Sequence, residues 1–283
     1  MKNGIDKEWT RDDLPHNRTE VFFDCIKVRF FTFLKMGVVL LLFMLPSLFV
    51  CFLSDSAYSE LYLALNSGTI DESVYSARYS SYAFAFSVAY VPCFIIAAIG
   101  LSGIMKVIRR LVFGEAVFFR QDFFDGMRQS AVQYAVIGLI AALLPVLFNG
   151  AVPTDKTQST ILFVLKCLSV TLVSPVLAFS LCGSTVYKMR LFTLIKNSVI
   201  LYFANLPKTL IFIAVFALSF LITLIGDLMI KYLALALFFV AVCPLILTAW
   251  FLFCCYVFDK HMNKDNFPDL YDKGVFRKES ENK

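Results

Sequence analysis

Apolar residues occur along the chain in six continuous runs of about twenty residues each. A helix of this length crosses the ~30 Å hydrocarbon core of a membrane, whereas a membrane-spanning strand needs only about ten residues of alternating polarity. The pattern therefore predicts an all-α polytopic membrane protein with six transmembrane helices. The predicted spans are 36–53, 82–104, 130–148, 161–182, 210–225 and 232–258.

Polar stretches divide the chain into three parts: an N-terminal segment, a six-helix transmembrane domain and a tail. These parts cover residues 1–35, 36–258 and 259–283. The Tyr-rich stretch 54–81 is the longest connection on one side, and the sequence Thr69-Ile70-Asp71-Glu72 within it fits a capping box, where a helix can begin. We expect an outer loop at 54–81 and inner loops at 105–129 and 183–209.

Lys and Arg residues are distributed unevenly between the two sides of the predicted bundle. Of 26 such residues, 22 lie in the N-terminal segment, the two inner loops and the tail. Only Arg78, Lys156 and Lys231 lie on the opposite side, and Lys166 lies within a span. Because connections rich in Lys and Arg are retained in the cytoplasm, we expect both termini to be cytoplasmic.

The composition excludes several classes of protein. Apolar residues make up 59% of the chain and charged residues 17%, whereas soluble domains are about half apolar and a quarter charged. The net charge of +5 is spread along the chain, so we expect no nucleic-acid partner. The eight Cys and two His residues lack the spacing of metal ligands, and no hydrolase or nucleotide-binding motif occurs. We therefore expect no cofactor, no metal and no enzymatic activity.

A short pattern recurs before the first, third and fifth spans. Residues 22–27, 123–128 and 191–196 each contain two bulky residues, two variable residues, one apolar residue and a cation. Tyr134 and Tyr202 extend the match between the second and third copies. The pattern favours three tandem helical hairpins, each preceded by a cytoplasmic interfacial helix with its Phe at the acyl boundary and its cation at the headgroups. The alternative is chance similarity between common residues.

The first inner loop carries the densest polar motif of the chain. Arg110, Glu115 and Asp122 lie close together in sequence, and Gly114 is placed to end the extended second helix. Local ion pairing is one interpretation of these charges. The alternative is a docking surface for a partner protein.

The inner-loop motif resembles the YesL-like family of bacterial integral membrane proteins. The similarity extends over about residues 22–276, apart from the outer loop, and its motif positions are Gly103, Arg110, Gly114, Glu115, Asp122, Phe123 and Phe124. The resemblance implies an accessory role in carbohydrate uptake beside ABC-type transport components, in the bacterial plasma membrane. It implies no catalytic residue, because the family has none assigned.

Two functional hypotheses follow. The first is a non-enzymatic accessory or regulatory membrane protein whose partners are the lipid bilayer and ABC-transporter subunits, or a homo-oligomer. The second is a small-solute transporter or channel that acts on its own. The proline in or beside each span and the intramembrane Lys166 are the features that motivate it. Lys166 lies near the outer end of its span, where a snorkelling side chain is the alternative interpretation.

Overall fold

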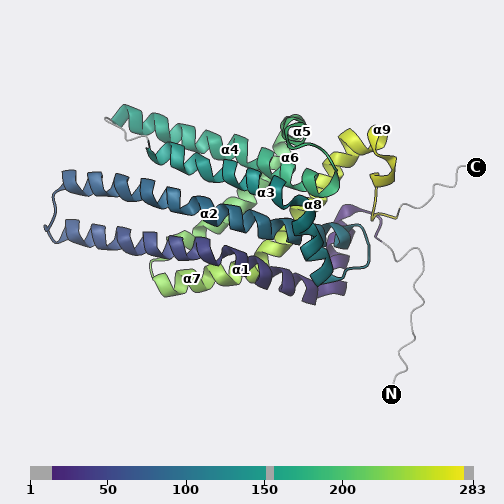
Figure 1. Ribbon diagram of the computed structural model, residues 1–283, viewed down its shortest axis with the longest axis horizontal. Helices are drawn as coiled ribbons and strands as arrows, with labels where there is room; N and C mark the ends of the chain where they lie inside the picture. Colours follow the sequence, from purple (N-terminus) through teal and green to yellow (C-terminus); the bar gives the residue numbers. More distant parts are fainter. Residues whose placement is uncertain (1–14, 151–155, 277–283) are drawn as a thin grey trace, which may run out of the picture.

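The computed structural model describes residues 15–150 and 156–276, which are helical apart from short connections and contain no strand (Figure 1). Six helical segments in this part of the chain are long and apolar enough to cross a membrane. The prediction of an all-α polytopic membrane protein is therefore confirmed. In chain order the elements are α1 (Arg18–Asn66), α2 (Glu72–Val112), α3 (Phe119–Gly150), α4 (Lys156–Val186), α5 (Leu191–Ala204), α6 (Leu206–Ala217), η2 (Leu218–Leu224), α7 (Leu228–Leu237), η3 (Phe238–Val242), α8 (Cys243–Phe258), η4 (Asp259–Asn263), α9 (Lys264–Asn266) and η5 (Pro268–Leu270).

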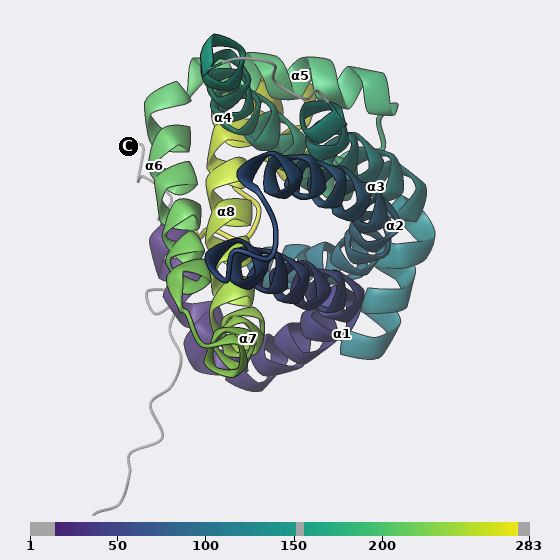
Figure 2. The same ribbon diagram turned by 90° about the vertical axis from the view of Figure 1, so that its left-hand side faces the viewer.

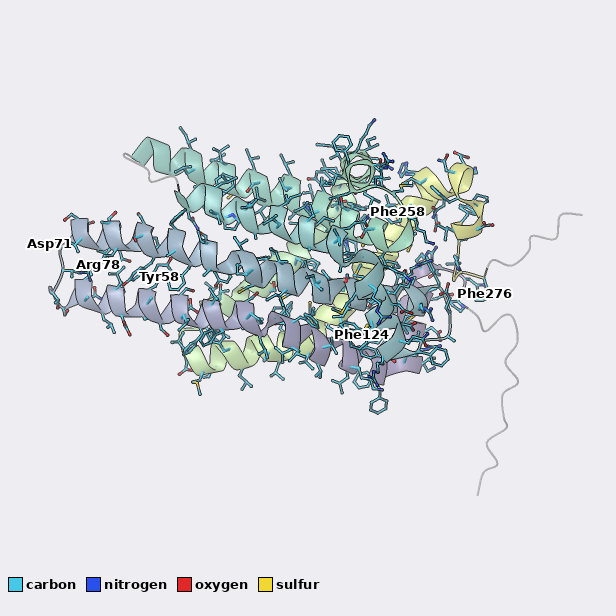
Figure 3. The ribbon with its side chains drawn as sticks, in the orientation of Figure 1. Tyr58, Asp71, Arg78, Phe124, Phe258 and Phe276 are labelled. Atoms are coloured by element: carbon cyan, nitrogen blue, oxygen red, sulfur yellow. The ribbon has the colours of Figure 1, made fainter. Side chains whose placement is uncertain are left out.

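The long helices run along one axis, and the two ends of the bundle differ (Figure 1). One end holds α5, α9, the α2–α3 connection and both ends of the described chain. We call it the basic end, because Lys and Arg are concentrated there. The opposite end is the hairpin end, where α1 turns into α2. Figure 3 places Asp71 and Arg78 at the hairpin end and Phe124 and Phe276 at the basic end. Viewed along the axis, the elements surround a common centre, with α6 lying beside α8 (Figure 2).

The predicted outer loop 54–81 is instead mostly helical. Helix α1 continues to Asn66 and α2 begins at Glu72, so only 67–71 form the turn. At 1.5 Å per residue, the 49 residues of α1 extend about 73 Å, far beyond a ~30 Å hydrocarbon core. The rings of Tyr58 and Tyr79 are 4.9 Å apart, and such aromatic contacts between the two helices stabilise the extension. This packing is tertiary and could not be predicted from the polar composition.

The three predicted interfacial helices differ in form. The third copy of the repeat lies in a separate helix, α5, which ends where Asn205 leaves the helical conformation two residues before Pro207. The first copy continues into α1 with one non-helical residue, Arg29, and the second begins α3 without a break. The third copy is separated from its span where a following proline, which has no backbone N–H, ends the hydrogen-bond ladder, and the first copy is set off from its span by a kink at Arg29. Only for the second copy, which continues straight into its span, was the prediction of a separate helix wrong.

The three copies nevertheless lie in matching environments. In each copy the second bulky residue is exposed and the fourth residue is buried. The exposed residues are Phe23, Phe124 and Phe192, and the buried ones are Cys25, Gly126 and Leu194. The hydroxyls of Tyr134 and Tyr202 both donate to backbone carbonyls of α4, at 2.8 and 3.1 Å. This agreement in burial supports a structural repeat rather than chance similarity.

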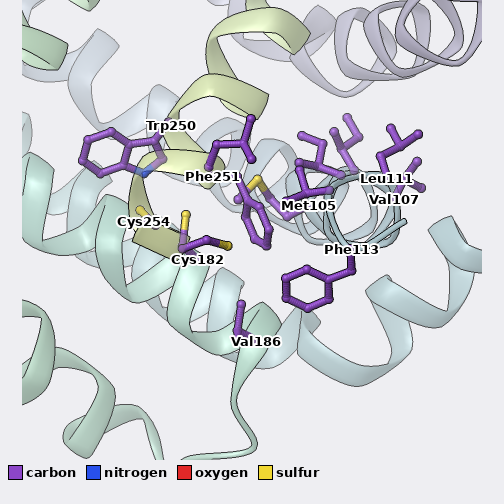
Figure 4. Packing of buried hydrophobic residues seen from close by; sticks show 14 of the residues in the cluster. Met105, Val107, Leu111, Phe113, Cys182, Val186, Trp250, Phe251 and Cys254 are labelled. Carbon is purple, nitrogen blue, oxygen red and sulfur yellow. The ribbon is translucent and has the colours of Figure 1, made fainter. Parts of the chain in front are cut away.

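The sixth predicted span is continuous but not uniform. A π-helical segment, η3, separates α7 from α8 just before Pro244. Pro244 has no backbone N–H and so cannot donate to the helical hydrogen-bond ladder. Gly37 of α1 packs directly against the backbone carbonyl of Val240 in η3, and any side chain at this glycine would clash with it. The buried core lies between this region and the basic end, where Met105, Trp250 and Phe251 pack together (Figure 4).

Candidate functional site

An ion pair between the partly exposed Arg110 and the buried Asp122 forms the centre of the candidate site at the basic end. Arg110 lies in the last turn of α2 and Asp122 in the first turn of α3, with Nη1 and Oδ1 2.8 Å apart. The Asp122 side chain is 0% exposed, and its Oδ2 accepts a hydrogen bond from the Phe118 N–H at 2.8 Å. One carboxylate thus balances the guanidinium and satisfies a backbone donor at the start of α3.

The connection between α2 and α3 has a fixed geometry. Gly114 has φ +68°, and its N–H donates to the Leu111 carbonyl while the Glu115 N–H donates to the Arg110 carbonyl. These two bonds are those of a Schellman motif, which uses glycine at the left-handed position. The prediction that Gly114 ends the second helix is confirmed, because the helix ends at Val112 and Phe113 caps it.

Two glycines permit the helices beside this connection to approach closely. A Cβ atom on Gly103 would lie 2.5 Å from the ring of Phe123, and one on Gly126 would lie 2.9 Å from the carbonyl oxygen of Ser102. Both spacings are shorter than ordinary van der Waals contact. Gly103 and Phe123 therefore serve packing between α2 and α3.

The C-terminal part of the described chain contacts the same connection through Lys273. Its Nζ lies 2.8 Å from Glu115 Oε1 and 5.1 Å from the ring centre of Phe113. Partial burial raises the pKa of Glu115, but the hydrogen bond and charge of Lys273, together with Arg109 and Arg110, outweigh it and hold the pKa below its ordinary value. Glu115 is thus a charged partner of the tail.

The N-terminal end of α1 joins the cluster through Arg18. Its Nη2 lies 2.6 Å from Asp259 Oδ2, and its Nη1 donates to the Lys273 carbonyl at 2.7 Å. Asn263 donates to the other oxygen of Asp259 at 2.7 Å and accepts a hydrogen bond from Tyr187 of the α4–α5 connection. Four segments distant in sequence are therefore joined by polar contacts at one end of the bundle.

Of the predicted docking residues, Gly114 and Phe124 are exposed, and Phe124 lies among further exposed residues that the sequence did not single out. Phe118 and Phe124 are 64% and 50% exposed, and Arg120 and Gln121 between them are also exposed. We call these four residues the α3 surface. By contrast, Asp122, Phe123 and Gly103 are buried and Glu115 is engaged by Lys273, so local ion pairing describes these charges.

Lys166 lies apart from this site, near the hairpin end. It is exposed, and its Nζ donates to Asn149 Oδ1 at 3.0 Å. A different lysine is buried at this end: Lys231 lies 2.6 Å from Asp55 Oδ2, which also accepts a hydrogen bond from the Tyr232 hydroxyl at 2.9 Å.

The sequence alone does not indicate which of these charged residues form pairs. Lys231 and Asp55 were both placed on the outer side, and Arg18, Asp259 and Lys273 on the inner side. Opposite charges on one side were the available signal, but choosing the pairs requires the tertiary arrangement.

No family model, curated protein or solved structure matches the chain. Among the described residues, no group of three or more His, Cys, Asp or Glu side chains is arranged to hold a metal ion. The resemblance to the YesL-like family therefore stays a prediction.

Proposed function

We propose that this chain is a non-enzymatic accessory or regulatory membrane protein that binds a partner through the α3 surface. The partner that we propose is a subunit of an ABC-type carbohydrate transporter, because the inner-loop motif resembles the YesL-like family. The basic end faces the cytoplasm of a bacterial cell in this proposal, since Lys and Arg are concentrated there.

The observation that carries the proposal is that the exposed α3 surface lies beside a buried carboxylate that joins α2 and α3. The Arg110–Asp122 pair fixes the start of α3, and Phe118, Arg120 and Phe124 beside it are exposed. Aromatic residues and Arg are the residue types that dominate binding energy in protein interfaces. Fixing them in advance lowers the ordering cost of association.

The test is affinity purification in mild detergent from native membranes, followed by mass spectrometry of the co-purifying proteins. We expect stoichiometric recovery of ABC-transporter subunits. The double variant Phe118→Ala/Phe124→Ala should lose them, because removing each interface aromatic costs about 2 kcal/mol or more.

The repeat supplies a matched control for this variant. Phe23 and Phe192 occupy the position of Phe124 in the other two copies and are similarly exposed. The variant Phe23→Ala/Phe192→Ala should therefore retain the partner. Equal retention by both variants, or recovery of the protein alone or only as a homo-oligomer, would overturn the proposal.

A second candidate is a small-solute transporter or channel that acts alone. The buried Lys231–Asp55 pair favours it, because this pair lies at the outer end of two predicted spans, where a paired ionisable group can mark the entrance of a transport pathway. Uptake of a labelled sugar such as maltose by the purified, reconstituted protein tests this candidate. Uptake that is lost in Lys166→Met or Lys231→Met without lower expression would support it, and no uptake would reject it for that solute.

A further inference from the structure

An apolar cavity of about 370 Å³ lies at membrane depth between α2, α4, α6 and α8. Its floor is formed by the buried residues Met105, Cys182 and Trp250, which come from three different helices (Figure 4). Its rim includes the exposed residues Val170 of α4 and Phe216 of α6. A cavity with a buried apolar floor and an exposed rim on lipid-facing helices fits a hydrocarbon chain.

The polar groups in this cavity are already satisfied. The Ser174 hydroxyl donates to the Val170 carbonyl of its own helix, and the Trp250 indole N–H donates to the Ala178 carbonyl at 3.5 Å. A polar ligand would therefore lose its hydration without gaining partners. This excludes sugars and ions as ligands that fit the cavity and favours an apolar one.

A second cavity, of about 400 Å³, adjoins the first toward the basic end. Phe212 lines both. The second cavity is also lined by Arg18, Thr19, Lys208 and Tyr256, and by no carboxylate. Arg18 is balanced by Asp259. The exposed Lys208 forms no ion pair among the described residues, and its Nζ lies 4.6 Å from the ring centre of Tyr256. An uncompensated cation beside a hydroxyl is suited to a phosphate group.

The separation of the two cavities matches a lipid. Lys208 and Phe216 lie on the same helix, and eight residue steps of α6 cover about 12 Å. One hydrocarbon leaflet is about 15 Å thick, half of the bilayer core. A headgroup at Lys208 therefore places its acyl chain alongside Phe212 and within the apolar cavity.

We propose that the paired cavities along α6 and α8 bind one anionic phospholipid, with its phosphate at Lys208 and Thr19 and an acyl chain against Trp250. This inference is independent of the proposed function. It assigns a lipid to this face of the protein, whereas the α3 surface binds a protein partner.

The cavity contains its own reporter. The chain has two Trp residues, so Trp9→Phe leaves Trp250 as the single fluorophore. The purified protein is reconstituted in phosphatidylcholine vesicles that contain increasing fractions of dibrominated phosphatidylglycerol or dibrominated phosphatidylcholine, since bromine quenches tryptophan on contact. We expect half-maximal quenching at about fivefold lower mole fraction for phosphatidylglycerol, the advantage of one cation near anionic lipid.

Two variants separate the headgroup from the chain. Lys208→Gln should abolish the fivefold preference, whereas Lys196→Gln, which removes an exposed cation that lines neither cavity, should keep it. Ser174→Phe at the exposed rim should reduce quenching by both lipids, and Ala217→Phe should do the same from α6.

Several results would overturn the proposal. Equal quenching by the two lipids, an unchanged preference in Lys208→Gln, or an equal loss in Lys196→Gln would show that no headgroup site exists at Lys208. Loss of the preference in excess inorganic phosphate, with no effect of Ser174→Phe or Ala217→Phe, would indicate an anion site without a bound chain.

Discussion

The two ends of the bundle each hold an ion pair between one buried and one partly exposed side chain, but the surroundings of the two pairs differ. At the basic end, Asp122 is wholly buried and joins helices that follow each other in sequence, within a cluster that also holds Arg18 and Asp259. At the hairpin end, Lys231 pairs with Asp55 across 176 positions of sequence, and the Asp55 side chain is 24% exposed.

This difference has a physical consequence. At the basic end the charges fix a connection whose outer side is the exposed α3 surface. At the hairpin end one pair holds α7 against α1, and Tyr232 supplies the remaining hydrogen bond. The first arrangement organises a surface, and the second attaches a short helix to a long one. The following variants test this distinction, from the largest expected effect to the smallest.

Removing the Asp122 carboxylate should have the largest effect. Asp122→Ala leaves the Phe118 N–H without its acceptor and leaves Arg110 only the more distant Glu115, whose Oε2 lies 3.9 Å from Nε, so the free energy of unfolding should fall by about 3 kcal/mol. Denaturant-induced unfolding of the purified protein in detergent measures this change. Asp125→Ala, in the same turn of α3, is the control and should change stability by less than about 0.5 kcal/mol. Equal effects of the two substitutions would show that the buried pair has no special role.

The two lysines near the hairpin end should respond differently to the same substitution. Lys231→Met leaves Asp55 bonded only to Tyr232 and should cost about 2 kcal/mol, less than a fully buried pair because Asp55 is partly exposed. Lys166→Met removes only an exposed bond to Asn149 and should cost less than about 0.5 kcal/mol. Unfolding of both variants under one set of conditions measures the difference in the free energy of unfolding. A larger loss of stability in Lys166→Met than in Lys231→Met would contradict the assignment of the Lys231–Asp55 ion pair.

The contact between Glu115 and Lys273 should give the smallest effect, and one that depends on pH. The pKa of Glu115 is lower in the folded protein than its ordinary value of 4.5, so its charge stabilises the fold above that value. This contribution is lost as the pH falls through the lowered pKa. Wild-type protein should therefore be more stable than Glu115→Gln at neutral pH, and the difference should shrink below about pH 4.5. A difference that grows on acidification would contradict the assigned contact.

Much of the fold follows from the sequence, because hydrophobic run length and helix-ending signals are local. All six predicted spans lie within the observed helical segments, the fifth to within one residue, and Gly114 ends α2 as expected. The extension of α1 and α2 beyond the membrane depends on Tyr58 and Tyr79 meeting across the hairpin, which is a tertiary contact.

The candidate site was predictable in composition but not in geometry. Gly103, Arg110, Glu115 and Asp122 were identified from one stretch of sequence. Their partner Lys273 lies 158 positions after Glu115, and nothing local distinguishes it from the other lysines of the tail. Burial also divides the motif in a way that the sequence does not reveal, since the adjacent residues Phe123 and Phe124 face opposite environments.

The central claim is that the α2–α3 connection and the C-terminal part of the described chain form one cluster, which lies on the cytoplasmic side in the proposed orientation. Zero-length cross-linking with a membrane-impermeant carbodiimide tests it directly, because Glu115 Oε1 and Lys273 Nζ are 2.8 Å apart. We predict an amide bond between Glu115 and Lys273 in inside-out vesicles and none in right-side-out vesicles, with mass spectrometry identifying the linked peptides. Cross-linking of Glu115 to other lysines without Lys273, or the same product from the outer side, would contradict the account.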